Sequence, residues 1–210
     1  MKIAPEHIVL MGDSIFDNAA YVLNGIDVIT NLRRKLPEGW RASLIARDGS
    51  MVNDVIDQIR QIPGDASFIV VSAGGNDALS HINILNETAN SVAEVLLKLS
   101  IIQDGFISNY RKMLNSVLSC GIQTTVCTIY NPRFPDPYIQ RLARVALSIF
   151  NDCMVAEALR ARLRLIDLRD VCKEDTDYAN PIEPSETGGK KIAEAIYNTV
   201  TNYHLSHFSN

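Results

Sequence analysis

The sequence contains few cysteines, and their spacing argues against two common kinds of site. Cys120, Cys127, Cys153 and Cys172 form no C-x-x-C pair and have no histidines beside them in the sequence. Zinc sites and redox-active dithiols need such clusters, so neither is indicated. We expect buried, reduced thiols, and nothing in the sequence implies a metal ion or an organic cofactor.

The chain also lacks an excess of positive charge. It has 20 Lys and Arg residues against 24 Asp and Glu residues, a formal net charge of −4, and no basic stripe. Proteins bind nucleic acids and anionic membrane surfaces through concentrated positive charge. We therefore expect neither of these as a partner.

Long hydrophobic runs are missing as well. The first residues, MKIAPEHIVLMGDS, reach an acidic side chain at Glu6 before any apolar run has begun. A secretory signal needs an uninterrupted apolar stretch, and a membrane-spanning helix needs about 20 mostly apolar residues. We expect no signal peptide, no membrane span and a cytoplasmic location.

The sequence does contain a regular alternation of two kinds of apolar segment. Hydrophobic residues make up 47% of the 210 residues and charged residues 21%, which is typical of a globular domain, and we expect one domain over 1–210. Short apolar runs rich in β-branched residues predict buried strands at 7–11, 42–46, 67–73, 123–130 and 163–168. Apolar residues at helical spacing lie between and after these runs, at 52–59, 92–99, 106–118, 142–150 and 192–200. This alternation predicts a parallel five-stranded sheet in a three-layer α/β/α sandwich.

Polar residues and glycines follow the first three predicted strands. Ligands bind at the carboxyl ends of strands in such sheets, so these positions are candidates for a site. Ser14 in GDS is a candidate nucleophile or a helix N-cap, and Gly49 in RDGS is at least a turn glycine. Asn76 in GGND is either an amide donor to a developing oxyanion or the first residue of an Asx turn.

Taken together and in this order, the motifs resemble those of the SGNH hydrolases, the GDSL esterase and lipase superfamily. The likeness extends from GDS through DGS and GGND to PIEPSETGGKKIA near the end of the chain. It implies a flavodoxin-like sheet of five parallel strands and an enzyme that cleaves acyl or acetyl esters. It also implies that Ser14 is the nucleophile and that the Ser14 and Gly49 backbone N–H groups and the Asn76 amide form the oxyanion hole.

The last motif departs from the family pattern, in which an aspartate, two residues, a histidine and a proline follow one another. Pro184 fits that pattern, but Glu183 occupies the histidine position and Asn180 the aspartate position. Because prolines follow both residues, we expect them in extended conformations. Either the site is degenerate, or Glu183 is the proton acceptor and Asn180 donates a hydrogen bond that orients it. A third interpretation makes Glu183 only a carboxylate near a helix N-terminus.

Four further residues are candidates for roles near Ser14. His81 lies beyond the third predicted strand, where it is an alternative base or a solvated loop residue. Arg133, in the proline-rich loop after the fourth strand, either binds an anionic group of the substrate or faces solvent. Asp13 and Asp77, which adjoin Ser14 and Asn76, are candidate substrate contacts.

Two functional hypotheses follow from these residues. The first is a serine esterase that cleaves a small-molecule ester through an acyl-enzyme on Ser14, with Glu183 as an atypical base. The second is a catalytically impaired binding module that keeps the same cleft for a small acyl or sugar ligand.

Overall fold

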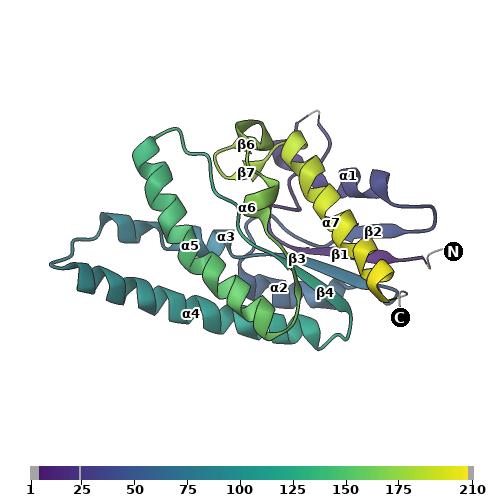
Figure 1. Ribbon diagram of the computed structural model, residues 1–210, viewed down its shortest axis with the longest axis horizontal. Coiled ribbons are helices and arrows are strands. Elements are labelled where there is room, and N and C mark those ends of the chain that lie inside the picture. The colour runs from purple at the N-terminus through teal and green to yellow at the C-terminus, as the bar shows by residue number, and fades with distance from the viewer. Residues whose placement is uncertain (1–4, 24, 208–210) are drawn as a thin grey trace.

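The computed structural model describes residues 5–23 and 25–207, with side chains described through residue 202. In this part of the chain five strands form one parallel sheet in the order β2-β1-β3-β4-β5, with helices on both of its faces (Figure 1). The predicted fold class is therefore confirmed. The strands are β1 (His7–Gly12), β2 (Arg41–Leu44), β3 (Phe68–Ser72), β4 (Gln123–Cys127) and β5 (Arg164–Ile166).

The central strand β1 shows why its sequence has no polar alternation. All six residues are buried, and successive side chains point to opposite faces of the sheet. Ile8 and Leu10 pack into one hydrophobic cluster, and Val9 and Met11 pack into the other. Burying each such side chain contributes about 1.5 to 3 kcal/mol, so β1 anchors both cores at once.

Each face of the sheet is covered by its own helices. On one face lie α1 (Val28–Lys35) and α7 (Glu186–His207), which pack on each other and supply Leu32 and Ile196 to the first cluster. The other face carries three helices, which supply side chains to the second cluster: α2 (Val52–Gln58), α4 (Val92–Leu118) and α5 (Pro137–Arg160). The remaining described elements are short: α3 (Gly75–Ser80), α6 (Leu168–Val171) and the 3-10 turns η1 (Ala19–Tyr21), η2 (Ile59–Gln61), η3 (Ile82–Asn86) and η4 (Asp175–Asp177).

Helix α4 is longer than the sheet that it covers. Its 27 residues span about 40 Å at 1.5 Å per residue, whereas a five-residue strand spans about 17 Å. Its fully buried residues begin only at Phe106, so the first part of the helix overhangs the sheet together with α3 and η3 (Figure 1). Residues of η3 and of this part of α4, including Ile82 and Ile102, line the pocket described below.

A short antiparallel hairpin precedes α7. Its strands are β6 (Tyr178–Asn180) and β7 (Glu183–Pro184), and Asn180 pairs with Glu183. The extended conformations predicted from the following prolines are thus confirmed. The hairpin holds Glu183 at a fixed place above the sheet.

Other features of the described residues bear on the function classes considered above. All four cysteines are free thiols, three of them buried and Cys120 partly exposed. Among the described side chains, no group of three or more His, Cys, Asp or Glu is arranged to hold a metal ion. None of the described helices combines the length and the apolar character that crossing a membrane requires.

Candidate active site

The chain leaves β1 through a sharp turn that presents Ser14. Gly12 has φ +121°, and a Cβ atom there would lie 1.6 Å from the Ser72 carbonyl oxygen of β3, so only glycine fits. The Asp13 N–H donates to the same carbonyl oxygen at 3.0 Å, which ties the turn to β3. Ser14 follows in this turn, and the first α-helix begins only at Val28, which Asp27 caps. The N-cap interpretation of Ser14 is therefore wrong.

Ser14 forms a hydrogen bond with Glu183, the residue at the histidine position of the last motif. The Ser14 hydroxyl donates a hydrogen bond of 3.1 Å to Glu183 Oε1, across 169 positions of the chain. Glu183 is only 6% exposed, and its Oε2 has no hydrogen-bond partner among the described residues. A carboxylate and a serine hydroxyl in hydrogen-bond contact have the geometry of a base and a nucleophile.

Burial changes the acidity of Glu183. Removal from water raises the pKa of its carboxyl to about 7, and the negative charge of Asp48 adds to the rise, while the Ser14 hydrogen bond works against it. An unperturbed histidine has a pKa near 6.5, so the buried carboxyl titrates in the same range. Glu183 is thus suited to accept and return a proton near neutral pH.

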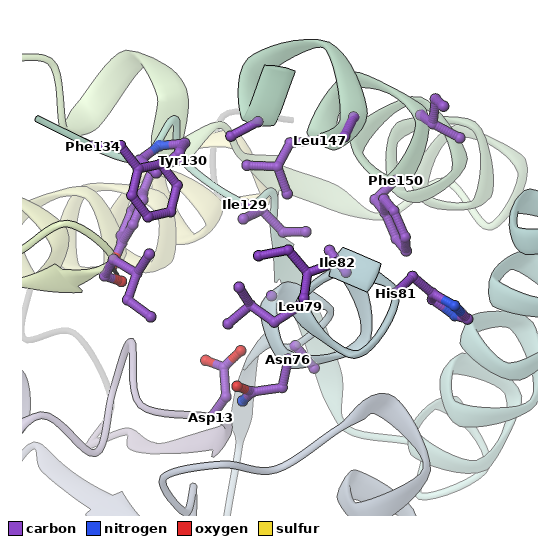
Figure 2. Close-up of a pocket in the computed structure, with 18 of the residues that line it drawn as sticks. Asp13, Asn76, Leu79, His81, Ile82, Ile129, Tyr130, Phe134, Leu147 and Phe150 are labelled. Carbon is purple, nitrogen blue, oxygen red and sulfur yellow. Dashed lines mark hydrogen bonds between the residues drawn. The ribbon is translucent and has the colours of Figure 1, made fainter. Parts of the chain in front are cut away.

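A second buried carboxyl, that of Asp13, lies beside this pair. Burial raises its pKa to about 7, the charge of Glu183 adds to the rise, and hydrogen bonds from the Ile15 N–H and from Ser72 lower it. Since one negative charge disfavours a second nearby, the ionisation of Glu183 keeps Asp13 neutral to higher pH. Asp13 lines the same pocket as Asn76, and the two side chains lie next to each other (Figure 2).

Asn76 lies in the first turn of α3, and its side-chain amide is hydrogen-bonded to a loop that is distant in the sequence. Its Nδ2 donates a 3.0 Å hydrogen bond to the Ser50 carbonyl, 26 residues away, so the local Asx-turn interpretation is wrong. An amide nitrogen has two N–H bonds, and the second stays available for a ligand. Gly49, in the same loop as Ser50, has φ +79°. Within the described residues the backbone N–H groups of Gly49 and Ser14 have no hydrogen-bond acceptor.

A buried glutamine that sequence reasoning missed joins these two loops. Gln58 Oε1 accepts from the Gly12 N–H at 2.8 Å, and its Nε2 donates to the Gly12 carbonyl at 2.8 Å and to Ser50 Oγ at 3.3 Å. Gln58 is 2% exposed at the end of α2. The available signal was its position three residues after Val55, on the apolar stripe of that helix, where a polar side chain needs a partner.

Comparisons with known proteins show which fold this is. No protein-family model and no curated protein sequence matches the chain. Among solved structures, a member of the lipolytic G-D-S-L family from Veillonella parvula matches with a TM-score of 0.68 at 14% identity, over 93% of this chain and 98% of its own. An extracellular lipase from Streptomyces rimosus matches with a TM-score of 0.67 at 13% identity, over 93% and 99%. Est24, a carbohydrate acetylesterase from Sinorhizobium meliloti, matches with a TM-score of 0.66 at 12% identity, over 94% and 99%.

This chain has the GDSL lipase fold.

In this GDSL fold, Asn180 does not do what the sequence suggested. Its side-chain oxygen accepts hydrogen bonds from the Ile182 and Glu183 N–H groups, both at 3.0 Å, and the residue is exposed. Asn180 therefore shapes the hairpin backbone, and no hydrogen bond to the Glu183 carboxyl was found among the described contacts. The prediction that its amide orients that carboxyl is corrected accordingly.

Two of the other candidates lie away from Ser14 and Glu183. The Asp77 carboxylate accepts from the Val52 N–H at 3.1 Å and so caps the start of α2, which leaves it with a structural role. His81 lines the pocket, but its ring lies on the side away from Asp13 and Asn76 (Figure 2). It is exposed at the end of α3, as its solvated interpretation expected.

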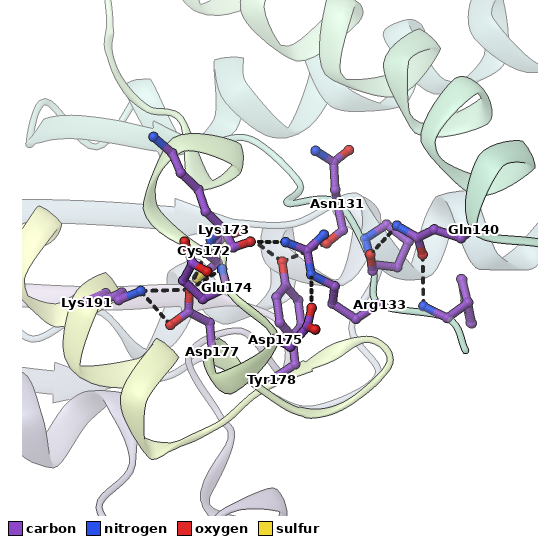
Figure 3. A network of polar contacts seen from close by, with 12 residues as sticks. Asn131, Arg133, Gln140, Cys172, Lys173, Glu174, Asp175, Asp177, Tyr178 and Lys191 are labelled. Atoms are coloured by element: carbon purple, nitrogen blue, oxygen red, sulfur yellow. Dashed lines mark hydrogen bonds and ion pairs between the residues drawn. The ribbon is translucent and has the colours of Figure 1, made fainter. Parts of the chain in front are cut away.

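Arg133 also has a structural role. Its guanidinium pairs with Asp175 at 3.0 Å, donates to the Lys173 carbonyl oxygen and lies 5.3 Å from the Tyr178 ring centroid (Figure 3). Its backbone N–H donates to the Pro181 carbonyl at 2.8 Å. Arg133 thus fastens the loop after β4 to the segment that carries Glu183, and neither of its predicted roles is correct.

A Ser, a His and an Asp do meet in this GDSL fold, at the other edge of the sheet. His7 Nδ1 lies 3.0 Å from Asp65 Oδ1, and His7 Nε2 lies 2.8 Å from Ser43 Oγ. His7 begins β1, whereas Ser14 follows the end of that strand, so the two groups are separated by the length of the sheet. His7 therefore takes no part in the site around Ser14, and Ser43 provides a control for any test of Ser14.

Proposed function

We propose that the protein is a carboxylic ester hydrolase in which Ser14 is the nucleophile and Glu183 is the general base. The observation that carries the proposal is the 3.1 Å hydrogen bond from the Ser14 hydroxyl to a buried carboxyl whose pKa is raised to about 7. The solved structures with the same fold include enzymes described as lipases and as a carbohydrate acetylesterase, which supports this reaction class.

The reaction proceeds through an acyl-enzyme. Ser14 Oγ attacks the carbonyl carbon of the ester while its proton passes to Glu183 Oε1. The carbonyl oxygen becomes an oxyanion, which accepts hydrogen bonds from the Ser14 and Gly49 N–H groups and the Asn76 amide. The protonated Glu183 then gives its proton to the departing alkoxide, so the alcohol leaves neutral.

Water completes the cycle. Glu183 takes a proton from a water molecule as the water oxygen attacks the acyl carbon, and the same three donors stabilise the second oxyanion. Collapse of this intermediate expels Ser14 Oγ, which recovers its proton from Glu183. A neutral Asp13 favours both steps, because a second negative charge beside Glu183 would oppose its return to the ionised state.

Hydrolysis of p-nitrophenyl butanoate tests the proposal. Ser14→Ala should lower kcat/KM by at least about 10³-fold, because the nucleophile is lost. Glu183→Gln should lower it by about 10²- to 10⁴-fold, because glutamine cannot accept the proton. The matched controls Ser43→Ala and Glu186→Gln, at a serine outside the site and at an exposed acid, should keep wild-type rates.

Equal rates for wild type and Ser14→Ala would overturn the proposal. A wild type that turns over no ester but still binds a small acyl ligand would instead support the binding-module hypothesis.

A further inference from the structure

The pocket that contains Ser14 has two chemically different ends. Nearly all of its polar lining residues gather at the edge of the sheet: Asp13, Ser14, Ser72, Asn76, Tyr130 and Glu183. Beyond them the lining is almost entirely aliphatic and aromatic (Figure 2). None of the described residues that line it is a Lys or Arg, and the one polar side chain away from the sheet edge is His81, so this end lacks the fixed positive charge that a phosphate or a carboxylate substrate would need.

Four helical elements enclose the apolar end, which we call the apolar slot. Leu79 and Ile82 come from α3 and η3, and Leu147 and Phe150 come from α5 (Figure 2). Ile102 comes from the overhanging part of α4. Because this part of α4 lies beyond the sheet, no strand fills the space between it and α5. The slot is a consequence of the unusual length of α4.

Side-chain size along α5 keeps the slot open. Ala143 and Ala146 line it, one helical turn apart, whereas Val145 on the same turn is absent from the lining and is 64% exposed. Small residues at the two inward positions leave room where larger ones would close the space. The wall opposite is apolar yet uncovered, since Ile82 is 50% exposed and Leu85 43% exposed.

We propose that the apolar slot binds the unbranched hydrocarbon chain of a medium- or long-chain acyl ester, with the ester carbonyl at Ser14. This rests on the function proposed above and extends it to a substrate class. A chain of methylene groups matches a lining without charge, and it covers the exposed aliphatic side chains of η3. An acetyl group would leave the slot empty and gain nothing from it.

Chain length provides the first test. Each methylene removed from water improves binding by up to about fourfold, so kcat/KM should rise along acetate, butanoate, hexanoate, octanoate and decanoate p-nitrophenyl esters. We expect the decanoate to exceed the acetate by at least about 100-fold, below the full additive gain because part of the chain stays hydrated. A profile that is flat or falls beyond butanoate would overturn the inference while leaving the esterase proposal standing.

A single substitution tests whether the acyl chain of the substrate occupies the apolar slot. Ala146→Phe fills the slot, so the ratio of decanoate to butanoate kcat/KM should fall by about tenfold or more. Val145→Phe adds the same side chain on the solvent face of the same turn and should keep the wild-type ratio. Equal ratios in all three proteins would show that the chain does not occupy the slot.

A binding measurement separates this inference from the function on which it rests. Calorimetric titration of Ser14→Ala with 1-butanol, 1-hexanol and 1-octanol should show affinity rising by about tenfold or more per added pair of methylenes, and Ala146→Phe in that background should abolish the trend. If the wild type hydrolyses no ester but this trend holds, the slot is confirmed and the esterase proposal fails. If no alcohol binds better than butanol, the slot proposal fails whatever the esterase result.

Discussion

At the scale of single residues, one substitution relative to the family pattern defines this site. A carboxyl at the histidine position is an intrinsically weaker base by about two pKa units, unless its surroundings raise the pKa. Burial does raise the pKa of Glu183 to about 7, and the negative charge of Asp48 adds to the rise. The protein thus reaches the acidity of an imidazole by leaving a carboxylate poorly solvated.

That arrangement has a cost in stability, which can be measured. The folded-state pKa of Glu183 is raised above its unfolded value of 4.5, so its contribution to stability is present below pH 4.5 and is lost as the pH rises through about 7. Glu183→Gln carries no such charge. The variant should therefore be more stable than wild type by about 1 to 3 kcal/mol above pH 7, a range that allows for solvent screening.

Urea unfolding of wild type and Glu183→Gln at about pH 4 and about pH 8 checks this. The stability difference should be small at the lower pH and appear at the higher one. A difference that does not change with pH would mean that the Glu183 pKa is not raised.

Residue-level prediction from the sequence succeeded where a motif fixed the position and failed where contacts decided the role. The meeting of Ser14 and Glu183 followed from motif order along the chain and is present in the fold. The roles of Asn180, Asp77 and Arg133 depend on which backbone groups lie within hydrogen-bond distance in the folded chain, and a sequence pattern does not contain that information.

At the scale of elements, the site is built from loops that a helix holds together. The turn after β1 and the loop before α2 come from separate crossovers, and Gln58 at the end of α2 bonds to both. Short apolar runs revealed the five strands, and apolar residues at helical spacing revealed the longer helices. It did not separate α3 from its loop, because Gly75–Ser80 is too short to show a period.

The bridging role of Gln58 predicts a specific kinetic effect. Gln58→Leu removes the hydrogen bonds to Gly12 and to Ser50 Oγ, so the loop whose Ser50 carbonyl holds the Asn76 amide loses one of its anchors. We expect kcat on p-nitrophenyl butanoate to fall by about 10- to 100-fold, because oxyanion donors lose their placement, while KM changes by less than about threefold. The Gly12 N–H is left unpaired, which should cost about 1 to 3 kcal/mol of stability, while the Gly12 carbonyl still accepts from the Arg47 N–H.

Two comparisons make this result interpretable. Gln61→Leu changes an exposed glutamine whose described contact is with Arg47, and it should leave kcat unchanged. The pH dependence of kcat should be the same in Gln58→Leu as in wild type, because Glu183 is untouched. A loss confined to KM, or a displaced pH profile, would contradict a positioning role.

At the scale of the whole molecule, two hydrophobic clusters on opposite faces of the sheet fix the positions of the strand ends. The residues of the proposed active site follow those ends. The fold class followed from sequence because parallel strands buried on both faces are recognisable as apolar runs. The overhang of α4 did not, since only packing against the sheet shows where its buried part begins. A single domain and a cytoplasmic location remain predictions.

The most direct test of the central claim is the rate at which a fluorophosphonate probe labels Ser14 as a function of pH, followed by intact mass and peptide mapping. We expect a labelling rate that rises with pH and levels off above about pH 7, because Glu183 must be ionised to accept the proton. Labelling should vanish in Ser14→Ala and slow by about 10²- to 10⁴-fold in Glu183→Gln. Labelling of another residue, or an equal rate in Glu183→Gln, would contradict the account.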